Sequence, residues 1–442
     1  MQKPNIIPLA ILLAVALLAT FMPAIPTTIV TEGINSGDTA WMLCATALVL
    51  LMTPGLAFFY GGMVNSKNVI STMLQSFVAM GVIGLLWVVV GFSLAFGTSI
   101  GGFVGDPRTF FLFRGVLDGK PWSLAPTIPL ALFAFFQMKF AIITPALITG
   151  SFAERINFKS YIVFIVLFSL VVYAPLAHWT WHPNGFLFKL GVLDFAGGTV
   201  VHMSAGWAAL ASAIYLKPRK LHAADQVLPP ANIPFVLLGT GLLWFGWFGF
   251  NAGSAGAANT LAVSAFSTTN VAASAAGLAW ILFDVARGKK LSALGFCIGA
   301  VVGLVAITPA SGFVTVPVSI FIGAVAGVTS NFFAHLRSKS RLDDTLDVFP
   351  CHGIGGMVGL IMTGIFASKA VNAAAANGLA YGGTALFVKH LLALVIVSGF
   401  TFGASFALLK LTDLITPLRV SEEEELLGLD VSQHEEQLLV GA

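Results

Sequence analysis

Long runs of apolar residues recur along almost the whole chain, separated by short segments that contain charged residues, glycine or proline. A helix needs about 20 mostly apolar residues to cross the hydrocarbon core of a bilayer. After the N-terminal region, the pattern predicts eleven such helices. Their expected ranges are 39–62, 70–97, 127–150, 160–180, 197–216, 233–254, 261–284, 292–308, 314–335, 349–367 and 386–412.

The N-terminal segment, residues 1–30, needs a separate interpretation. Lys3 precedes an apolar stretch from Ile6 to Met22, and two prolines follow. This order resembles a secretory signal peptide, although no clear small-residue cleavage site follows it. The alternative is an additional spanning helix. The segment is therefore expected to be a signal peptide or an extra N-terminal helix.

Composition excludes most other classes of protein. Hydrophobic residues make up 57% of the chain and charged residues only 9%, against about 25% charged residues in a soluble domain. The net charge of +3 is too small to indicate a nucleic-acid partner. The three cysteines all lie in apolar runs, so we expect small buried residues and no disulfide framework. No cofactor is expected.

The basic residues predict how the chain is oriented, because cytoplasmic loops carry an excess of Lys and Arg. Most of them follow odd-numbered spans or the last span: Lys67, Arg155, Lys159, Lys217, Arg219, Lys220, Arg287, Lys289, Lys290, Arg337, Lys339, Arg341, Lys410 and Arg419. The mature N-terminus is then expected outside and the C-terminus in the cytoplasm of a multi-pass protein of the cell (inner) membrane.

One pattern occurs twice, at the same position in each half of the chain. Asp194 precedes His202, and Asp344 precedes His352 with the same spacing. In both copies a glycine follows four residues after the histidine. The histidines fall in the fifth and tenth expected spans, so the two copies cross the membrane in opposite directions. This arrangement is typical of an inverted-topology repeat.

The predicted fold class is thus an all-α polytopic membrane protein with two inverted five-helix repeats and a C-terminal eleventh helix. The expected divisions are 38–216 for the first repeat, 232–367 for the second, 385–414 for the eleventh helix and 415–442 for a cytoplasmic tail.

Ionisable residues inside spans are costly and by default indicate a functional site. Two imidazoles that share a hydrogen bond leave a donor or an acceptor directed into a narrow lumen, which suits a small polar solute better than a hydrated ion. His202 and His352 lack the cysteine or carboxylate neighbours that would complete a zinc site, so no metal is expected.

Several segments together resemble the ammonium transporter family, the bacterial Amt branch of the Amt/Mep/Rh group. These segments cover nearly the whole chain: Pro54-Gly55-Leu56-Ala57-Phe58-Phe59-Tyr60-Gly61-Gly62, Ala153-Glu154-Arg155, Asp194-Phe195-Ala196-Gly197-Gly198-Thr199-Val200-Val201-His202, Gly246-Trp247-Phe248-Gly249-Phe250-Asn251-Ala252-Gly253-Ser254-Ala255-Gly256 and Asp347-Val348-Phe349-Pro350-Cys351-His352-Gly353.

The resemblance implies a homotrimer in membrane lipid, with one pore through each subunit. By motif position, Trp181 and Ser254 resemble the outer ammonium site, with Phe140 beside it and Asp194 nearby. Phe140 and Phe250 resemble the stacked gate below that site. His202 and His352 resemble the family's paired pore histidines. From the residues alone, Asp194 is also placed to cap the N-terminus of the fifth span.

The implied function is ammonium transport, in which ammonium loses its proton above the gate and ammonia passes the histidines, with net charge transfer. The first alternative is an Rh-type neutral ammonia or gas channel, although Trp181 and Ser254 argue against it. The others are an ammonium sensor, disfavoured by the short segment after the last span, and a membrane enzyme, which would need catalytic groups beyond the two histidines.

The C-terminal tail and one lysine complete the comparison. The tail carries an acidic run and then Gly428 and Asp430, which resemble the family's regulatory element; charge pattern alone favours a solvated tail. The family also implies a possible cytoplasmic PII-type nitrogen-regulatory partner. Lys139 departs from the expected pattern because it lies beside Phe140 within a span, and we predict that it faces away from the pore.

Overall fold

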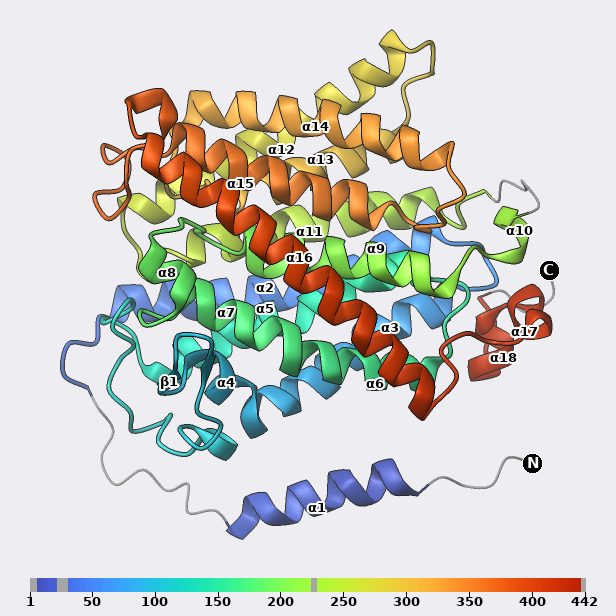
Figure 1. The fold of residues 1–442 in the computed structure, drawn as a ribbon, viewed down its shortest axis with the longest axis horizontal. Helices are drawn as coiled ribbons and strands as arrows, with labels where there is room; N and C mark the ends of the chain where they lie inside the picture. Colours follow the sequence, from blue (N-terminus) through green and yellow to red (C-terminus); the bar gives the residue numbers. More distant parts are fainter. Residues whose placement is uncertain (1–5, 22–30, 224–228, 439–442) are drawn as a thin grey trace.

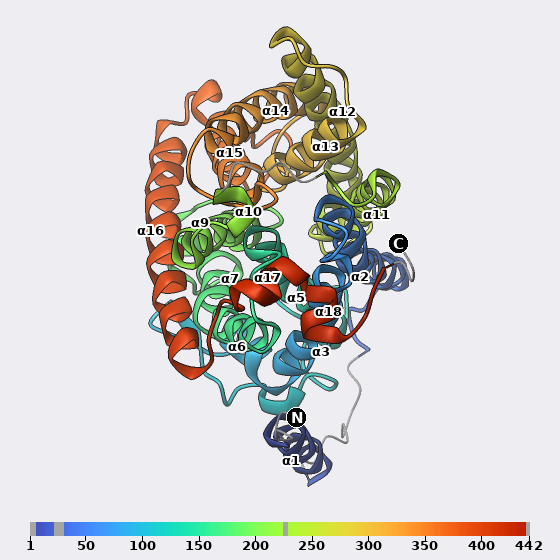
Figure 2. The same ribbon diagram turned by 90° about the vertical axis from the view of Figure 1, so that its right-hand side faces the viewer.

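The computed structural model describes residues 6–21, 31–223 and 229–438. Long helices run along one common direction, and loops and short elements gather at the two ends (Figure 1). Viewed along that direction, α5 (Leu130–Phe152) lies inside a surround of other helices (Figure 2). Most side chains of α5 are buried, so this helix forms a large part of the core that positions the site.

Within the described residues, ten helical segments are long and apolar enough to cross a membrane. They are Ser36–Met63, Val69–Phe96, Leu130–Phe152, Phe158–Leu190, Gly198–Leu216, Ile233–Gly253, Thr260–Ala286, Val316–Ser338, Phe349–Phe366 and Thr384–Ile415. The mainly helical, multi-pass character predicted from hydropathy is therefore confirmed, with one short antiparallel pair of strands outside the spans.

The eighth expected span, 292–308, corresponds to a shorter helix. This helix, α13 (Ala293–Ile307), has 15 residues and lies against α12 (Thr260–Ala286) and α14 (Val316–Ser338). Because it falls short of the usual spanning length of about 20 residues, the count of eleven spans remains a prediction.

Helix α1 (Ile7–Phe21) lies apart from the bundle (Figure 1), and none of its residues is buried. Its apolar side chains are largely exposed. This placement fits a removable segment and an extra membrane helix equally, so both interpretations stay open.

The remaining elements are either parts of the spans or lie in the segments between them. Several spans consist of an α-helix with a five- or six-residue π-turn. The elements are α2 (Ser36–Met63), α3 (Val69–Leu86), η1 (Trp87–Gly91), α4 (Phe92–Phe96), β1 (Ser99–Ile100), β2 (Val104–Gly105), η2 (Phe111–Phe113), α6 (Phe158–Phe168), η3 (Ser169–Tyr173), α7 (Ala174–Trp181), α8 (Phe186–Leu190), α10 (Lys220–Ala223), α11 (Ile233–Gly253), η6 (Leu379–Tyr381), α16 (Thr384–Ile415), α17 (Glu422–Leu427) and α18 (Leu429–His434).

Both repeated histidines lie on π-turns that begin their spans. His202 is in η4 (Gly198–Met203), which continues as α9 (Ser204–Leu216). His352 is in η5 (Phe349–Ile354), which continues as α15 (Gly355–Phe366). Single π-turns inside helices occur frequently at functional sites. Here they place both histidines in the middle of the protein.

The two histidine spans contact each other reciprocally. A Cβ on Gly206 would overlap the backbone of Gly353, the residue after His352. A Cβ on Gly356 would lie 3.1 Å from the backbone nitrogen of Met203, the residue after His202. The glycines of the repeated pattern therefore allow two backbones to cross closely. This reciprocity is what an inverted repeat requires, although the repeat itself remains a prediction.

Candidate functional site

A cavity of about 200 Å³ opens at the end of the bundle near Trp181, and we call it the Trp181 vestibule. All four residues predicted for an ammonium site line it: Phe140, Trp181, Asp194 and Ser254. The indole Nε1 of Trp181 donates to the backbone oxygen of Asp194 at 3.2 Å, which fixes the ring at the cavity wall. The hydroxyl of Ser254 donates to the backbone oxygen of Phe250 at 2.8 Å.

These contacts determine what kind of solute the vestibule can bind. Because the Ser254 proton is used by a backbone carbonyl, the lone pairs of its oxygen are free to accept a hydrogen bond from a bound solute. Trp181 and Phe140 lie edge to face, with ring centroids 5.8 Å apart. Aromatic faces attract a small cation by about 0.5–2 kcal/mol each. The arrangement suits a cation that can also donate hydrogen bonds.

Asp194 serves as the cap of the span that carries His202. Its carboxylate accepts hydrogen bonds from the backbone amides of Gly197, Gly198 and Thr199 at 2.7–2.8 Å, and from the Thr199 hydroxyl. The capping role predicted from the residues is thus observed. Asp344 caps the other histidine span in the same way, accepting from the backbone nitrogen of Phe349 at 2.7 Å.

Phe140 lines the Trp181 vestibule, and Phe250 packs against it on the side of the histidines. Phe140 and Phe250 come from α5 and α11, and their ring centroids are 4.2 Å apart. Both side chains are almost fully buried. The two rings separate the vestibule from the histidine cavity. The structure therefore brings together the two residues predicted as a gate.

Below the phenylalanines, the two histidines face each other. The Nδ1 atoms of His202 and His352 are 3.3 Å apart, so one ring donates and the other accepts. Both line a cavity of about 10 Å³, which we call the histidine cavity. Its other walls are apolar side chains, among them Trp247, whose ring is stacked 5.3 Å from that of His202. A volume of this size holds about one water molecule.

One further small cavity leads away from the histidines. This inner cavity, about 10 Å³ in volume, shares His352, Phe59 and Val301 with the histidine cavity. Beyond it lies a vestibule of about 450 Å³ at the opposite end of the bundle, the Arg219 vestibule. The histidine cavity, the inner cavity and the Arg219 vestibule are thus neighbours, separated by side chains.

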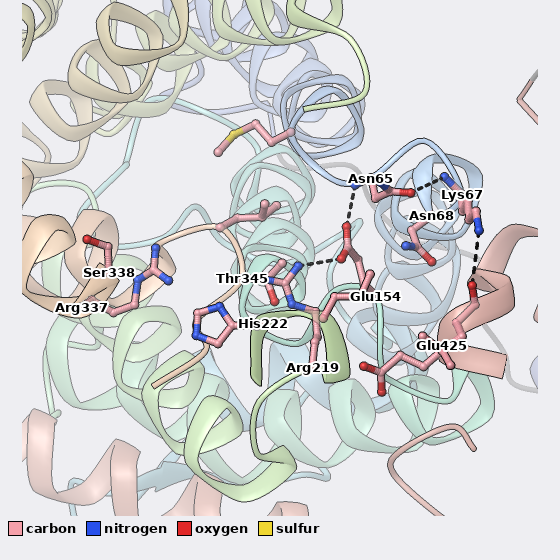
Figure 3. A pocket seen from close by; sticks show the side chains of 14 residues that line it. Asn65, Lys67, Asn68, Glu154, Arg219, His222, Arg337, Ser338, Thr345 and Glu425 are labelled. Carbon is pink, nitrogen blue, oxygen red and sulfur yellow. Dashed lines mark hydrogen bonds and ion pairs between the residues drawn. The ribbon is translucent and has the colours of Figure 1, made fainter. Parts of the chain in front are cut away.

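Charged side chains surround the Arg219 vestibule (Figure 3). Arg219 forms ion pairs with Glu154 at 2.6 Å and with Asp343 at 2.8 Å. Burial raises the pKa of Asp343, but hydrogen bonds from Arg219 and the charge of Arg155 outweigh burial and hold that pKa below its usual range. This vestibule is therefore polar and internally neutralised, unlike the apolar cavities above it.

The C-terminal tail packs against the start of α3. Asp430 is buried and accepts hydrogen bonds from the backbone amides of Ser71 at 2.7 Å and Ile70 at 3.1 Å. Gly428 has a φ of +104° and packs against Lys67 so closely that a Cβ would overlap it. The solvated tail favoured by charge pattern is wrong, because the tail folds back onto this end of the bundle. Neither Gly428 nor Asp430 lines the Arg219 vestibule.

Two histidines and one cysteine show what hydropathy leaves undetermined. His178 and His390 are fully buried. His390 hydrogen bonds through Nε2 with the Leu193 amide and through Nδ1 with the Leu360 carbonyl, so its role is structural. Cys44 is exposed on α2 rather than buried. Hydropathy alone does not distinguish a buried face from a lipid-facing one.

Gln137 and Lys139 lie close to Phe140 in α5. Gln137 lines the Trp181 vestibule, and its buried Oε1 lacks a hydrogen-bond partner among the described residues. Its position one turn before Phe140 was the signal that could have identified it. The amine of Lys139 lies 3.7 Å from the Met138 sulfur and 5.8 Å from the Phe135 ring centre. Lys139 does not line the vestibule, in agreement with the prediction.

Comparison with known proteins identifies the family to which this chain belongs. The model of the Ammonium Transporter Family matches residues 40–438. The chain belongs to the ammonium transporter family. The ammonium transporter of Bacillus subtilis is 46% identical over 403 residues, which cover 90% of this chain and 98% of that protein. A putative ammonium transporter of Methanothermobacter thermautotrophicus is 47% identical over 406 residues, 91% of this chain and 98% of that one.

Solved structures of the ammonium transporter family share the fold. The crystal structure of Saccharomyces cerevisiae Mep2 aligns with a TM-score of 0.83 and 36% identity, covering 89% of both chains. A sensor Amt protein aligns with a TM-score of 0.81 and 30% identity, covering 90% of this chain and 98% of that one. The family assignment from sequence motifs, including the bacterial Amt branch, is confirmed.

Proposed function

We propose that this ammonium transporter binds ammonium in the Trp181 vestibule, where the ion gives its proton to water. Ammonia is then conducted past His202 and His352, and the proton crosses the protein separately, so that net charge is transferred. One observation carries the proposal: a cation-attracting vestibule, a closed aromatic pair and a one-molecule histidine cavity are neighbours in that order. Phe140 lines the vestibule and Phe250 lines the histidine cavity, so this pair of rings is the boundary.

Desolvation explains why the proton is lost at this boundary. An unpaired cation moved into an apolar cavity loses many kcal/mol of hydration, on the order of tens by Born solvation. Aromatic faces and the Ser254 oxygen offset part of that cost only above Phe140. Neutral ammonia carries no such penalty and can exchange hydrogen bonds with the imidazoles. The buried negative charge of Asp194, held by three backbone amides, favours a cation in the vestibule.

The function is tested by uptake of radiolabelled methylammonium into proteoliposomes. We expect uptake above that of protein-free liposomes, and we expect unlabelled ammonium to compete with it while potassium does not. Equal competition by potassium would contradict selective recruitment in the Trp181 vestibule. Uptake no faster than in protein-free liposomes would contradict transport, and would favour the sensor alternative if ammonium still bound.

The orientation, assembly and partners belong to the same proposal. We place the Trp181 vestibule outside and the Arg219 vestibule, with its cluster of basic residues, in the cytoplasm of the inner membrane. The active form is a homotrimer with a pore in each subunit. The docked tail beside the Arg219 vestibule would be the contact site of a PII-type regulatory protein. The alternative of an Rh-type neutral channel differs by the absence of transported charge.

A further inference from the structure

The series of cavities has a second boundary, in addition to the one at Phe140 and Phe250. This second boundary lies between the inner cavity and the Arg219 vestibule. Met63 and Leu346 are the only described residues that line both spaces. Leu346 is 8% exposed. The two side chains therefore form the wall between a space of about 10 Å³ and one of about 450 Å³.

Hydrogen bonds fix the backbone on the Met63 side of this wall. Met63 is the last residue of α2. The carbonyls of its neighbours Gly62 and Val64 accept from the amides of Asn232 and Ala231 at 3.0 and 2.9 Å. These bonds tie the end of α2 to the segment that begins α11. Met63 is thus presented from a fixed position.

Leu346 is fixed in a similar way on the other side. Its amide donates to the carbonyl of Gly150 near the end of α5 at 3.0 Å. The buried guanidinium of Arg155 donates to the Thr345 hydroxyl at 2.7 Å and to the Asp343 carbonyl at 2.6 Å. The loop that carries Leu346 is therefore anchored to the core by both its backbone and its neighbours.

Polarity changes across these two side chains. The Arg219 vestibule is lined by charged groups, among them Glu154, Arg219 and Arg337. The inner cavity is lined mainly by apolar side chains, and its Tyr60 hydroxyl is already bonded to the Leu147 carbonyl at 2.9 Å. A hydrated cation in the vestibule would have to shed its water to pass.

We infer that Met63 and Leu346 form an apolar seal that determines specificity at this end of the pore. The seal keeps the water and cations of the Arg219 vestibule away from the histidines, while a small neutral solute passes when the flexible Met63 side chain moves. This inference rests on the proposed function, because it assigns an inner counterpart to the barrier at Phe140 and Phe250.

The reactivity of the native Cys351 thiol can test the seal without any measurement of transport. Cys351 lines the inner cavity, on the histidine side of Met63 and Leu346. In a Cys44→Ala, Cys297→Ala background, Cys351 is the remaining cysteine. The purified protein is exposed to silver ions in a chloride-free buffer, and thiols that have not reacted are labelled with a fluorescent maleimide after unfolding. The measured quantity is the rate at which silver protects Cys351.

The Met63 variants distinguish the effect of side-chain size from the effect of side-chain polarity. We expect slow protection with Met63 and with Met63→Leu, and protection about tenfold faster or more with Met63→Ala and Met63→Gln, because exposure of a thiol controls its reactivity. Leu426→Ala is the matched control, since Leu426 lines the Arg219 vestibule without lining the inner cavity; its rate should equal that of the parent.

Either of two results would overturn the seal: fast protection in the parent protein, or equal rates in the parent, Met63→Ala and Met63→Gln. A melting temperature measured for each variant ensures that the compared proteins are folded. Because silver reaches the thiol whether or not ammonium is transported, failure of the seal and failure of the proposed function remain distinguishable.

Discussion

Trp181 illustrates how a single side chain acquires its role from its surroundings. Its indole is held by the Asp194 carbonyl and faces the vestibule with Phe140 and Ser254. The neighbouring Trp179 instead donates to the Phe103 carbonyl at 2.7 Å and packs on Phe186 outside the vestibule. Two tryptophans only two positions apart in the sequence thus have different surroundings.

Replacing Trp181 by leucine should weaken recruitment more than conduction. Loss of one cation–π face of about 0.5–2 kcal/mol corresponds to a roughly two- to thirtyfold higher half-saturating ammonium concentration. Maximal flux should change less. Trp179→Leu is the control for a lost tryptophan. Initial rates of methylammonium uptake across a concentration series measure both quantities, and a lower maximal flux with unchanged half-saturation would contradict a recruitment role.

The buried histidines allow a second contrast at this scale. His202→Ala should abolish or alter conduction while the trimer stays intact, since only the other imidazole loses a partner. His390→Ala should instead destabilise the fold by about 1–3 kcal/mol, because the Leu193 amide is left without its acceptor. Uptake assays and thermal melting separate the two effects. Unchanged transport in His202→Ala would show that the pore assignment is wrong.

At the scale of elements, the crossing of the two histidine spans depends on glycine. The backbone of Gly353 leaves no room for a side chain on Gly206. Hydropathy predicted these spans, and motif spacing predicted their histidines. The π-turns η4 and η5 were not predicted, because a local change from i→i+4 to i→i+5 bonding leaves no mark in an apolar run.

Gly206→Val should therefore separate the two spans. Overpacking a tight core typically costs about 1–3 kcal/mol, and a backbone neighbour relaxes less than a side chain does. Gly399→Ala on α16 is the control, since nothing lies within 4 Å of the added Cβ there. We expect a lower melting temperature and folding yield for Gly206→Val alone. Equal melting temperatures would contradict the close crossing.

The loop before η5 supplies a pH-dependent contribution to stability. The pKa of Asp343 is lowered from its ordinary value of 3.8 despite burial, so its ion pair with Arg219 stabilises the fold above that pH. The contribution is lost as the pH falls through the lowered pKa. Melting curves should show Asp343→Asn less stable than the parent at neutral pH, with a difference that shrinks below about pH 4. A difference independent of pH would contradict this role.

For the whole molecule, sequence predicted the membrane spans and the family, because both depend on local runs of residues. It also predicted which residues meet in the Trp181 vestibule, by motif position. It did not predict the docked tail or the inner cavity. Gly428 packs against Lys67, and Met63 and Leu346 line the same cavity. Such distant pairs follow from packing rather than from any pattern along the chain.

The central claim is that ammonium loses its proton at the boundary formed by Phe140 and Phe250, next to a vestibule that is selective for ammonium. The most direct test is current on a solid-supported membrane bearing proteoliposomes, pulsed with ammonium and separately with potassium. We expect a current with ammonium and none with potassium. Equal currents would contradict selectivity. No ammonium current, together with internal alkalinisation in a stopped-flow experiment, would contradict charge transfer and indicate a neutral ammonia channel.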